Sequence, residues 1–215
     1  MTRTAATKTA AGSTAATHTA ARRGRPSTGA RERILEAAIE VLKADGYAGL
    51  TLAKVAARAG ESKPLVAYHF GSKQGVVGAA GRAIAEMITE EVLAAVDGAA
   101  TVEQVIRGVD AGIERVLDED ERVARLYFDL AAVSVVEPEV RGTIAEVNEQ
   151  WREVLIRLLT DASDGLPPAR PRVLTVMVIA GMQGMTLERI ERGATAERKR
   201  ARELFIRSVV AASTV

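Results

Sequence analysis

Apolar residues recur along most of the chain with the three- to four-residue period of an α-helix. The first clear series is Ile34, Ala37, Ala38, Val41 and Leu42, which would share one buried helical face. Alternation with a period of two, which a half-buried strand requires, does not occur in any stretch after this series. The pattern therefore predicts an all-α protein.

Capping and helix-breaking residues set the expected ends of the helices. Ser27 or Thr28 can cap the first helix, and Asp45-Gly46 should end it. Glycines and prolines separate the later apolar series. Further helices are expected at residues 51–59, 62–69, 72–96, 101–117, 120–136, 138–162, 168–192 and 195–212.

Two short helices in the first third of the chain are joined by a tight turn. Thr51 opens the first of them, and Gly60 can supply the left-handed backbone of the turn. Ser62 caps the second, and Pro64 lies in its first turn, where a missing N–H has little cost. A helix, a glycine turn and a capped short helix are typical of the helix-turn-helix, which binds DNA.

The segment from Leu50 to Val77 resembles the DNA-binding region of the TetR family of transcriptional regulators. Its sequence is LTLAKVAARAGESKPLVAYHFGSKQGVV, and the Tyr-His-Phe-x-Ser-Lys element is specific to that family. The resemblance covers residues 29–80. It implies an N-terminal three-helix DNA-binding domain, joined by a long helix to a C-terminal helical bundle for ligand binding and dimerisation.

The resemblance also implies DNA contacts for individual residues. The positions that face base edges in the major groove are Lys63, Pro64 and Leu65. The positions that hold phosphates are Thr51, Tyr68 and Lys73, and His69 packs beside them or reaches the backbone. Ala67 departs from the family, in which an aromatic residue is common, so some affinity must come from elsewhere.

The side-chain chemistry agrees with these roles. Lys63 can donate to guanine O6 or N7, and Leu65 can touch a thymine methyl group. Lys73 and the N-terminus of its helix form a natural phosphate site.

The N-terminal tail offers a second DNA contact. Residues 1–28 contain five basic residues and no acidic one, whereas the rest of the chain has 24 basic and 28 acidic residues. Arg22, Arg23 and Arg25 belong to a segment whose Arg-Gly-Arg-Pro core resembles an AT-hook, which enters the minor groove of A·T-rich DNA. We expect residues 1–26 to be a disordered basic tail that acts as this arm, with a solvated linker as the alternative.

The expected domains are a helix-turn-helix domain at residues 27–74 and a ligand-binding and dimerisation domain at residues 75–215. Aliphatic, aromatic and Met side chains could wall a pocket for an apolar or amphipathic ligand. The candidate lining residues are Met87, Tyr127, Phe128, Trp151, Met182 and Gln183. Ordinary core packing is the alternative for each of them.

Two apolar helices are candidates for the subunit interface. Residues 138–162 have apolar positions at near-heptad spacing, and residues 173–182 are apolar almost all round. Two such helices from each subunit could form the four-helix dimer interface that the resemblance implies, or an ordinary bundle within one chain. Gly75, Gly78 and Gly81 indicate either close helix packing or a soft segment that transmits ligand binding.

The chemistry of an enzyme is missing from the sequence. The chain has no cysteine, and its two histidines are His18 and His69. We find no metal-ligand spacing, nucleophile elbow or phosphate loop, so we expect no enzyme activity, no metal and no cofactor. The longest apolar run is shorter than the ~20 residues of a membrane span, which favours a cytoplasmic protein, nucleoid-associated when bound to DNA.

The sequence therefore predicts a bacterial DNA-binding regulator, a repressor that binds a palindromic operator as a homodimer and is released by a small-molecule effector. The alternative is an architectural or ligand-independent dimeric DNA-binding protein. Footprinting would separate the two, because the alternative predicts broad coverage of A·T-rich DNA instead of one palindromic site.

Overall fold

The computed structural model describes residues 29–163, 167 and 169–213. Within these ranges every regular element is an α-helix, which confirms the predicted fold class. The helices are α1 (Ala30–Gly49), α2 (Leu52–Ala59), α3 (Lys63–Phe70), α4 (Lys73–Val96), α5 (Val102–Asp120), α6 (Arg122–Val136), α7 (Pro138–Asp161), α8 (Arg170–Arg192) and α9 (Ala196–Ser213). Each predicted helix is present, with ends shifted by a few residues.

The helix-turn-helix has the predicted caps and turn. The Thr51 hydroxyl accepts a hydrogen bond from the Lys54 N–H at 3.2 Å, and the Ser62 hydroxyl accepts one from the Leu65 N–H at 3.3 Å. Gly60 between them has a φ of 65°, in the left-handed region that favours glycine. The caps and the turn therefore depend on contacts between residues that are close in sequence.

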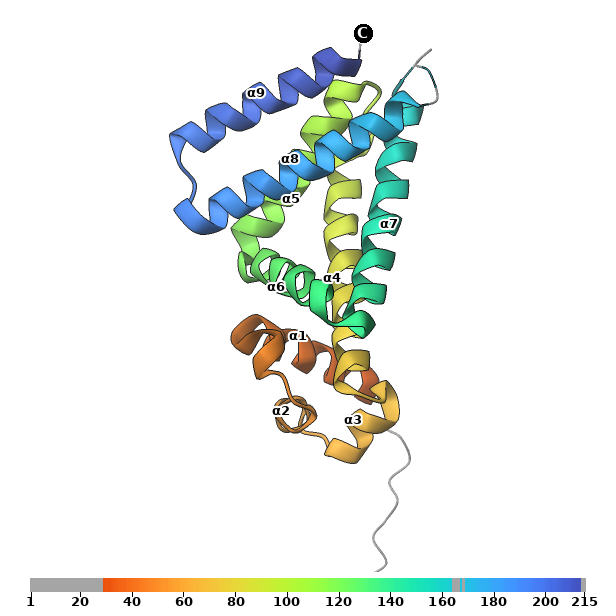
Figure 1. Cartoon of the computed structure of the whole chain (residues 1–215), viewed down its shortest axis with the longest axis vertical. Coiled ribbons are helices and arrows are strands. Elements are labelled where there is room, and N and C mark those ends of the chain that lie inside the picture. The colour runs from red at the N-terminus through yellow and green to blue at the C-terminus, as the bar shows by residue number, and fades with distance from the viewer. Residues whose placement is uncertain (1–28, 164–166, 168, 214–215) are drawn as a thin grey trace, which may run out of the picture.

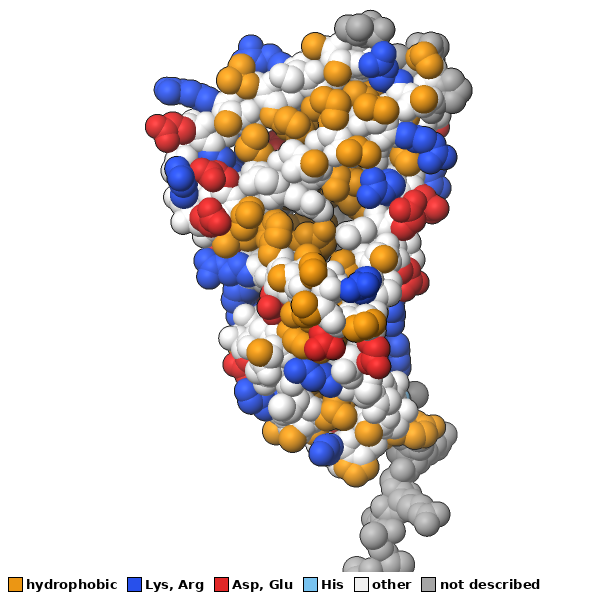
Figure 2. All heavy atoms as spheres, viewed as in Figure 1, with side chains coloured by type: hydrophobic (Ala, Val, Ile, Leu, Met, Phe, Trp, Pro, Cys, Tyr) orange, Lys and Arg blue, Asp and Glu red, His pale blue; other side chains and the backbone are white. Residues whose placement is uncertain are grey.

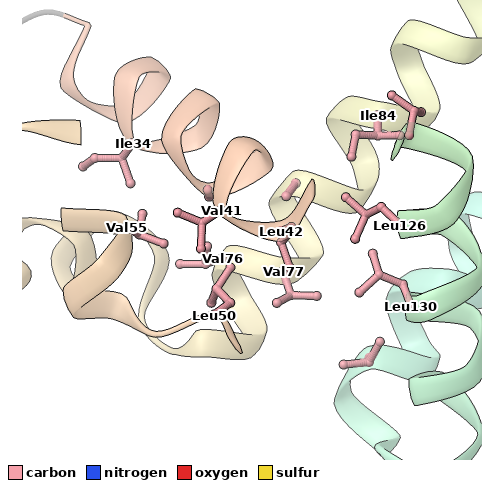
Figure 3. Packing of buried hydrophobic residues seen from close by; sticks show 14 of the residues in the cluster. Ile34, Val41, Leu42, Leu50, Val55, Val76, Val77, Ile84, Leu126 and Leu130 are labelled. Carbon is pink, nitrogen blue, oxygen red and sulfur yellow. The ribbon is translucent and has the colours of Figure 1, made fainter. Parts of the chain in front are cut away.

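Helix α4 connects a lower unit to an upper one. Figure 1 shows α1, α2 and α3 at one end of the molecule, with α4 rising from them beside α7 into a bundle that α5, α6, α8 and α9 complete. One hydrophobic core runs across this connection and includes Ile34 and Val55 below and Leu126 and Leu130 above. In Figure 3 the side chains of Leu42 and Val77 lie between these two groups. The helix-turn-helix unit is therefore packed against the bundle through a shared hydrophobic core, and α4 is not its only connection to the bundle.

Glycines allow close approaches between helices of the bundle. A Cβ on Gly112 of α5 would lie 2.7 Å from the Cα of Val92 in α4. A Cβ on Gly78 of α4 would lie 3.0 Å from the Thr143 hydroxyl of α7. At Gly78 the structure thus favours close packing over a soft segment.

Helix α1 bends at the position where the sequence predicts its end. Gly46 has a φ of 66° and a ψ of −177°, and one further helical stretch continues to Gly49. The Asp129 side chain of α6 accepts a hydrogen bond from the Tyr47 N–H at 2.7 Å. A Cβ on Gly46 would lie 3.1 Å from the same carboxylate oxygen. The bend is therefore a polar junction between the lower unit and α6.

Candidate DNA-binding surface and ligand cavity

The first turn of α3 faces solvent. Lys63 and Pro64 are exposed, while Leu65 is half-buried and packs against the core. Val66 is fully buried and fixes the rotation of the helix. No carboxylate pairs with Lys63 among the described residues, so its ammonium group is available to DNA.

The predicted phosphate contacts surround α3 but differ in exposure. Tyr68 is 75% exposed, and Thr51 is exposed although its hydroxyl caps α2. The Lys73 ammonium lies 4.1 Å from the centre of the Tyr47 ring, which holds it by a cation–π contact. His69 is half-buried, and its Nε2 is enclosed without a hydrogen-bond partner among the described residues. That placement fits packing better than a backbone contact.

Arg31, which the sequence analysis did not single out, also lies beside α3. Its side chain is exposed at the start of α1, with the guanidinium 5.4 Å from the centre of the Phe70 ring at the end of α3. By contrast, Lys54 and Arg58 of α2 pair with carboxylates at 2.8 and 3.8 Å. The sequence did give a signal for Arg31, because this arginine follows soon after the basic residues of the N-terminal tail. Arg22, Arg23 and Arg25 of the predicted arm lie outside the described residues.

The bundle contains a cavity of about 440 Å³, lined by side chains of α4, α5, α6, α7 and α8. Figure 2 shows apolar side chains gathered around a hollow in the middle of one face. Five of the sequence-predicted residues line this cavity: Tyr127, Phe128, Trp151, Met182 and Gln183. Met87 does not line it and is 39% exposed, because Ile84 and Ile88 are the residues that α4 turns inward.

A short chain of hydrogen bonds crosses the cavity wall. Gln183 Nε2 donates to the Tyr127 hydroxyl at 2.7 Å, and that hydroxyl donates to Asn148 Oδ1 at 3.1 Å. Burial raises the pKa of Tyr127 above its ordinary value, which the bond to Asn148 partly opposes. Tyr127 is therefore a neutral phenol. Asn148 was missed by sequence reasoning, although its spacing from Ile144 and Trp151 puts it on their helical face.

Helix α6 contacts both the cavity and the lower unit. Tyr127 and Phe128 line the cavity with their rings edge to face, 5.4 Å between centres. The next residue, Asp129, binds the backbone at the α1 bend. At the end of α5, next to the start of α6, Asp120 pairs with Lys43 of α1 at 3.2 Å. Helix α6 therefore joins the cavity wall to the bend of α1.

Hydrogen bonds from the Arg122 side chain hold the pKa of Asp120 well below its ordinary value, against the effect of partial burial. Lys43 acts in the same direction as Arg122.

Helix α8 has more exposed large apolar residues than any other helix of the bundle, and α9 adds one beside it. On α8, Val173, Val176, Met177 and Leu187 are exposed, and on α9 Leu204 is 59% exposed. In Figure 2 apolar side chains extend over the upper part of the same face, where Figure 1 places α8 in front. By length and composition α8 is the one helix of the described residues that could span a membrane, with a mean hydropathy of 1.3 over its best window.

For residues 138–162 the structure favours the second alternative, packing within one chain. The near-heptad residues of α7, including Val140, Ile144 and Leu155, are buried within the subunit. The exposed positions of α7 are mostly polar or small. The apolar face of α7 is therefore buried inside the chain.

Arginines hold α8 and α9 against α5. Arg189 of α8 bonds Glu114 at 3.0 Å and Asp118 at 2.7 Å. Arg202 of α9 also pairs with Glu114 at 3.0 Å, and the buried Arg198 joins the same carboxylate. One carboxylate that holds three guanidinium groups fixes the two outer helices in one orientation.

Comparison with known sequences gives two matches. The sequence model of bacterial regulatory proteins of the tetR family matches residues 34–80. The model of the C-terminal part of BetI-type transcriptional repressors matches residues 106–212. The chain belongs to the TetR family. It is a DNA-binding transcriptional regulator with an N-terminal helix-turn-helix, and not an enzyme.

Solved structures with the same fold include members of the TetR family. The multidrug binding protein EbrR complexed with imidazole is 27% identical, with a TM-score of 0.63 over 84% of this chain and 94% of that chain. A TetR family member from Streptomyces coelicolor A3, SCO1917, is also 27% identical, with a TM-score of 0.63 over 85% and 99% of the two chains. A Rhodococcus sp. regulator is 20% identical, with a TM-score of 0.70 over 86% and 98%. No curated protein matches the sequence.

Proposed function

We propose that this TetR-family regulator is a cytoplasmic repressor that binds a palindromic operator as a homodimer and leaves it when a small apolar or amphipathic ligand fills the cavity. The observation that carries the proposal is the arrangement of α6. Tyr127 and Phe128 are among its residues that line the cavity, and the next residue in sequence, Asp129, binds the α1 bend of the DNA-binding unit.

On the DNA side, the exposed N-terminal turn of α3 supports base contacts from Lys63, Pro64 and Leu65 in the major groove. Thr51, Tyr68 and Lys73 would hold phosphates, with His69 packed beside them, and we add Arg31 to this set. The basic tail with Arg22, Arg23 and Arg25 would follow the adjacent minor groove.

The outward apolar residues of α8 and α9 support a homodimer. Val173, Met177 and Leu187 lie on one side of α8 at helical spacing, and their burial against a second copy would remove them from water. Burial of α8 in a dimer interface would also explain why this helix is as apolar as a membrane span although the protein binds DNA. A two-fold dimer requires a palindromic site with half-sites about one turn apart, or a multiple of one turn.

On the ligand side, the apolar cavity with its Gln183–Tyr127–Asn148 hydrogen bonds supports binding of a small organic molecule. The relative EbrR is described as a multidrug binding protein and was solved with imidazole and with proflavin. A ligand against Tyr127 and Phe128 would displace α6 and with it Asp129. The α1 bend would shift, and the two recognition helices would lose the spacing that the operator requires.

Selection of bound duplexes from a random library, with the full-length protein, tests the DNA part of the proposal. We expect one palindromic sequence to be enriched. Gel shifts on that duplex with a panel of small molecules then test release. No enrichment over random competitor in mild salt would refute the proposal. Broad enrichment of A·T-rich duplexes, with no ligand effect, would instead support the architectural alternative.

A further inference from the structure

The cavity lining has charge of only one sign. Among the described residues that line the cavity, the ionisable groups with a formal charge are Glu86 and Glu90 of α4. No lysine, arginine or histidine of the described ranges lines it. An anionic ligand would therefore lose its hydration without gaining a cationic partner, which is costly in an apolar site.

Glu86 and Glu90 lie where the cavity meets solvent, because both line it and both are exposed. Neither forms an ion pair with a described residue, whereas the neighbouring Glu91 pairs with Arg115 at 3.9 Å. One helical turn separates the two carboxylates, so they place two negative charges on the same side of α4. Their field favours cations at the mouth of the cavity.

The inner wall can hold the body of an organic cation. Tyr127, Phe128 and Trp151 present aromatic faces or edges to the cavity, and aromatic faces attract cations. The Tyr127 hydroxyl gives its proton to Asn148 and accepts from Gln183, so its one donor is already used. The wall therefore offers an anion neither a positive charge nor the phenolic proton.

We propose that the effector of this protein is a lipophilic organic cation, held by the aromatic wall and by Glu86 and Glu90 at the cavity mouth. This inference rests on the proposed ligand-binding role of the cavity and names the chemical class of the ligand. Since an exposed charge pair typically changes an equilibrium by a factor of about three, the two carboxylates together should change affinity by about tenfold.

The experiment uses two ions of the same shape and opposite charge. Tetraphenylphosphonium and tetraphenylborate both carry four phenyl rings around a central atom. Each is titrated against the full-length protein that holds the neutral fluorophore N-phenyl-1-naphthylamine, and displacement is followed by fluorescence. We expect the phosphonium to displace the fluorophore at a concentration at least tenfold lower than the borate. Equal displacement by the two ions, including none by either, overturns the inference.

Matched variants locate the effect. The Glu86→Gln/Glu90→Gln double variant should bind the phosphonium about tenfold more weakly and the neutral fluorophore as well as the wild type does, which also shows that the cavity is intact. The Glu149→Gln/Glu153→Gln variant changes net charge equally at exposed positions of α7 outside the lining, and should bind the phosphonium like the wild type. The same loss in both variants overturns the assignment to Glu86 and Glu90.

The two proposals fail in different ways. If the neutral fluorophore does not bind the wild-type protein, the cavity is not a ligand site, and the proposed function fails together with this inference. If the fluorophore binds and the ions bind without preference for the cation, only the inference about charge fails.

Discussion

The recognition helix and the ligand cavity are built from the same kind of element but in different ways. The candidate base contacts, Lys63 to Leu65, are consecutive residues at one capped helix end. The cavity is lined by residues of five helices, and these residues are spread along the sequence from Gly81 to Thr186. The first site depends on local geometry and the second on the packing of the whole bundle. Substitutions at the first should therefore change DNA affinity alone, and substitutions around the second should also change stability.

The two regions meet at a few contacts rather than at a flexible linker. They share one hydrophobic core, and Asp129 and Lys43 add polar contacts between them. A regulator built in this way can have independent binding surfaces and still transmit a change from one to the other. Four predictions test this comparison.

The largest effect is expected at the recognition helix. The Lys63→Ala/Tyr68→Ala variant should lose about 3 kcal/mol of binding free energy for its selected operator, more than a hundredfold in affinity, because each contact contributes about 1–3 kcal/mol. Both side chains are exposed, so the free energy of unfolding should hardly change. Gel shifts and urea denaturation measure the two quantities. Lys199→Ala on α9 is the charge control, and the same DNA loss there would contradict the assignment.

The close approach of α4 and α5 should give the next largest effect. A Cβ at Gly112 meets the Val92 backbone, so Gly112→Ala should lower the free energy of unfolding by about 2 kcal/mol through overpacking. Gly142 of α7 has open space around it, and Gly142→Ala should raise stability by about 0.5–1 kcal/mol. Urea denaturation compares the two variants. If both stabilise the protein, the two helices tolerate separation, and the bundle is less tightly packed than we infer.

A substitution at Asp129 should change the free energy of unfolding less than Gly112→Ala does, and should clearly change the release of the operator by ligand. Asp129→Ala removes the acceptor for the Tyr47 N–H and should cost about 1 kcal/mol. Operator binding without ligand should persist, while release by ligand should weaken. Gel shifts with and without an effector measure the response, and Asp129→Asn, which keeps an acceptor oxygen, is the control. Full release in the alanine variant would show that the signal takes another route.

The smallest effect is expected from Asp120, whose pKa is lowered first by Arg122 and further by Lys43. A carboxyl with a depressed pKa in the folded state contributes stability above its ordinary pKa, and the contribution disappears as the pH falls through the folded value. Asp120→Asn should therefore cost less than about 1 kcal/mol at pH 7, and the difference from the wild type should shrink below about pH 4. Urea denaturation at several pH values checks this. A difference that does not depend on pH would mean that packing, and not the charge, matters at this position.

Much of the molecule follows from short-range patterns in its sequence. The caps at Thr51 and Ser62 and the turn at Gly60 depend on hydrogen bonds and backbone angles within a few residues. Helical periodicity likewise tells which side of each helix is apolar. The aromatic residues of the cavity and Gln183 could be predicted from the sequence, because an aromatic or polar side chain in an otherwise apolar helix can be recognised without knowledge of the neighbouring helices.

Only the tertiary structure decided which apolar face meets which neighbour. Periodicity indicated both α7 and α8 as interface helices, but packing buries the apolar side of α7, whereas α8 also has apolar residues such as Val173 and Val176 that face solvent. Met87 is a pocket residue by type, yet the rotation of α4 turns Ile84 and Ile88 inward instead. The contact of Asp129 with the α1 bend joins residues 82 positions apart. The rotation and spacing of packed helices depend on all of their partners at once, which is why no local pattern specifies such contacts.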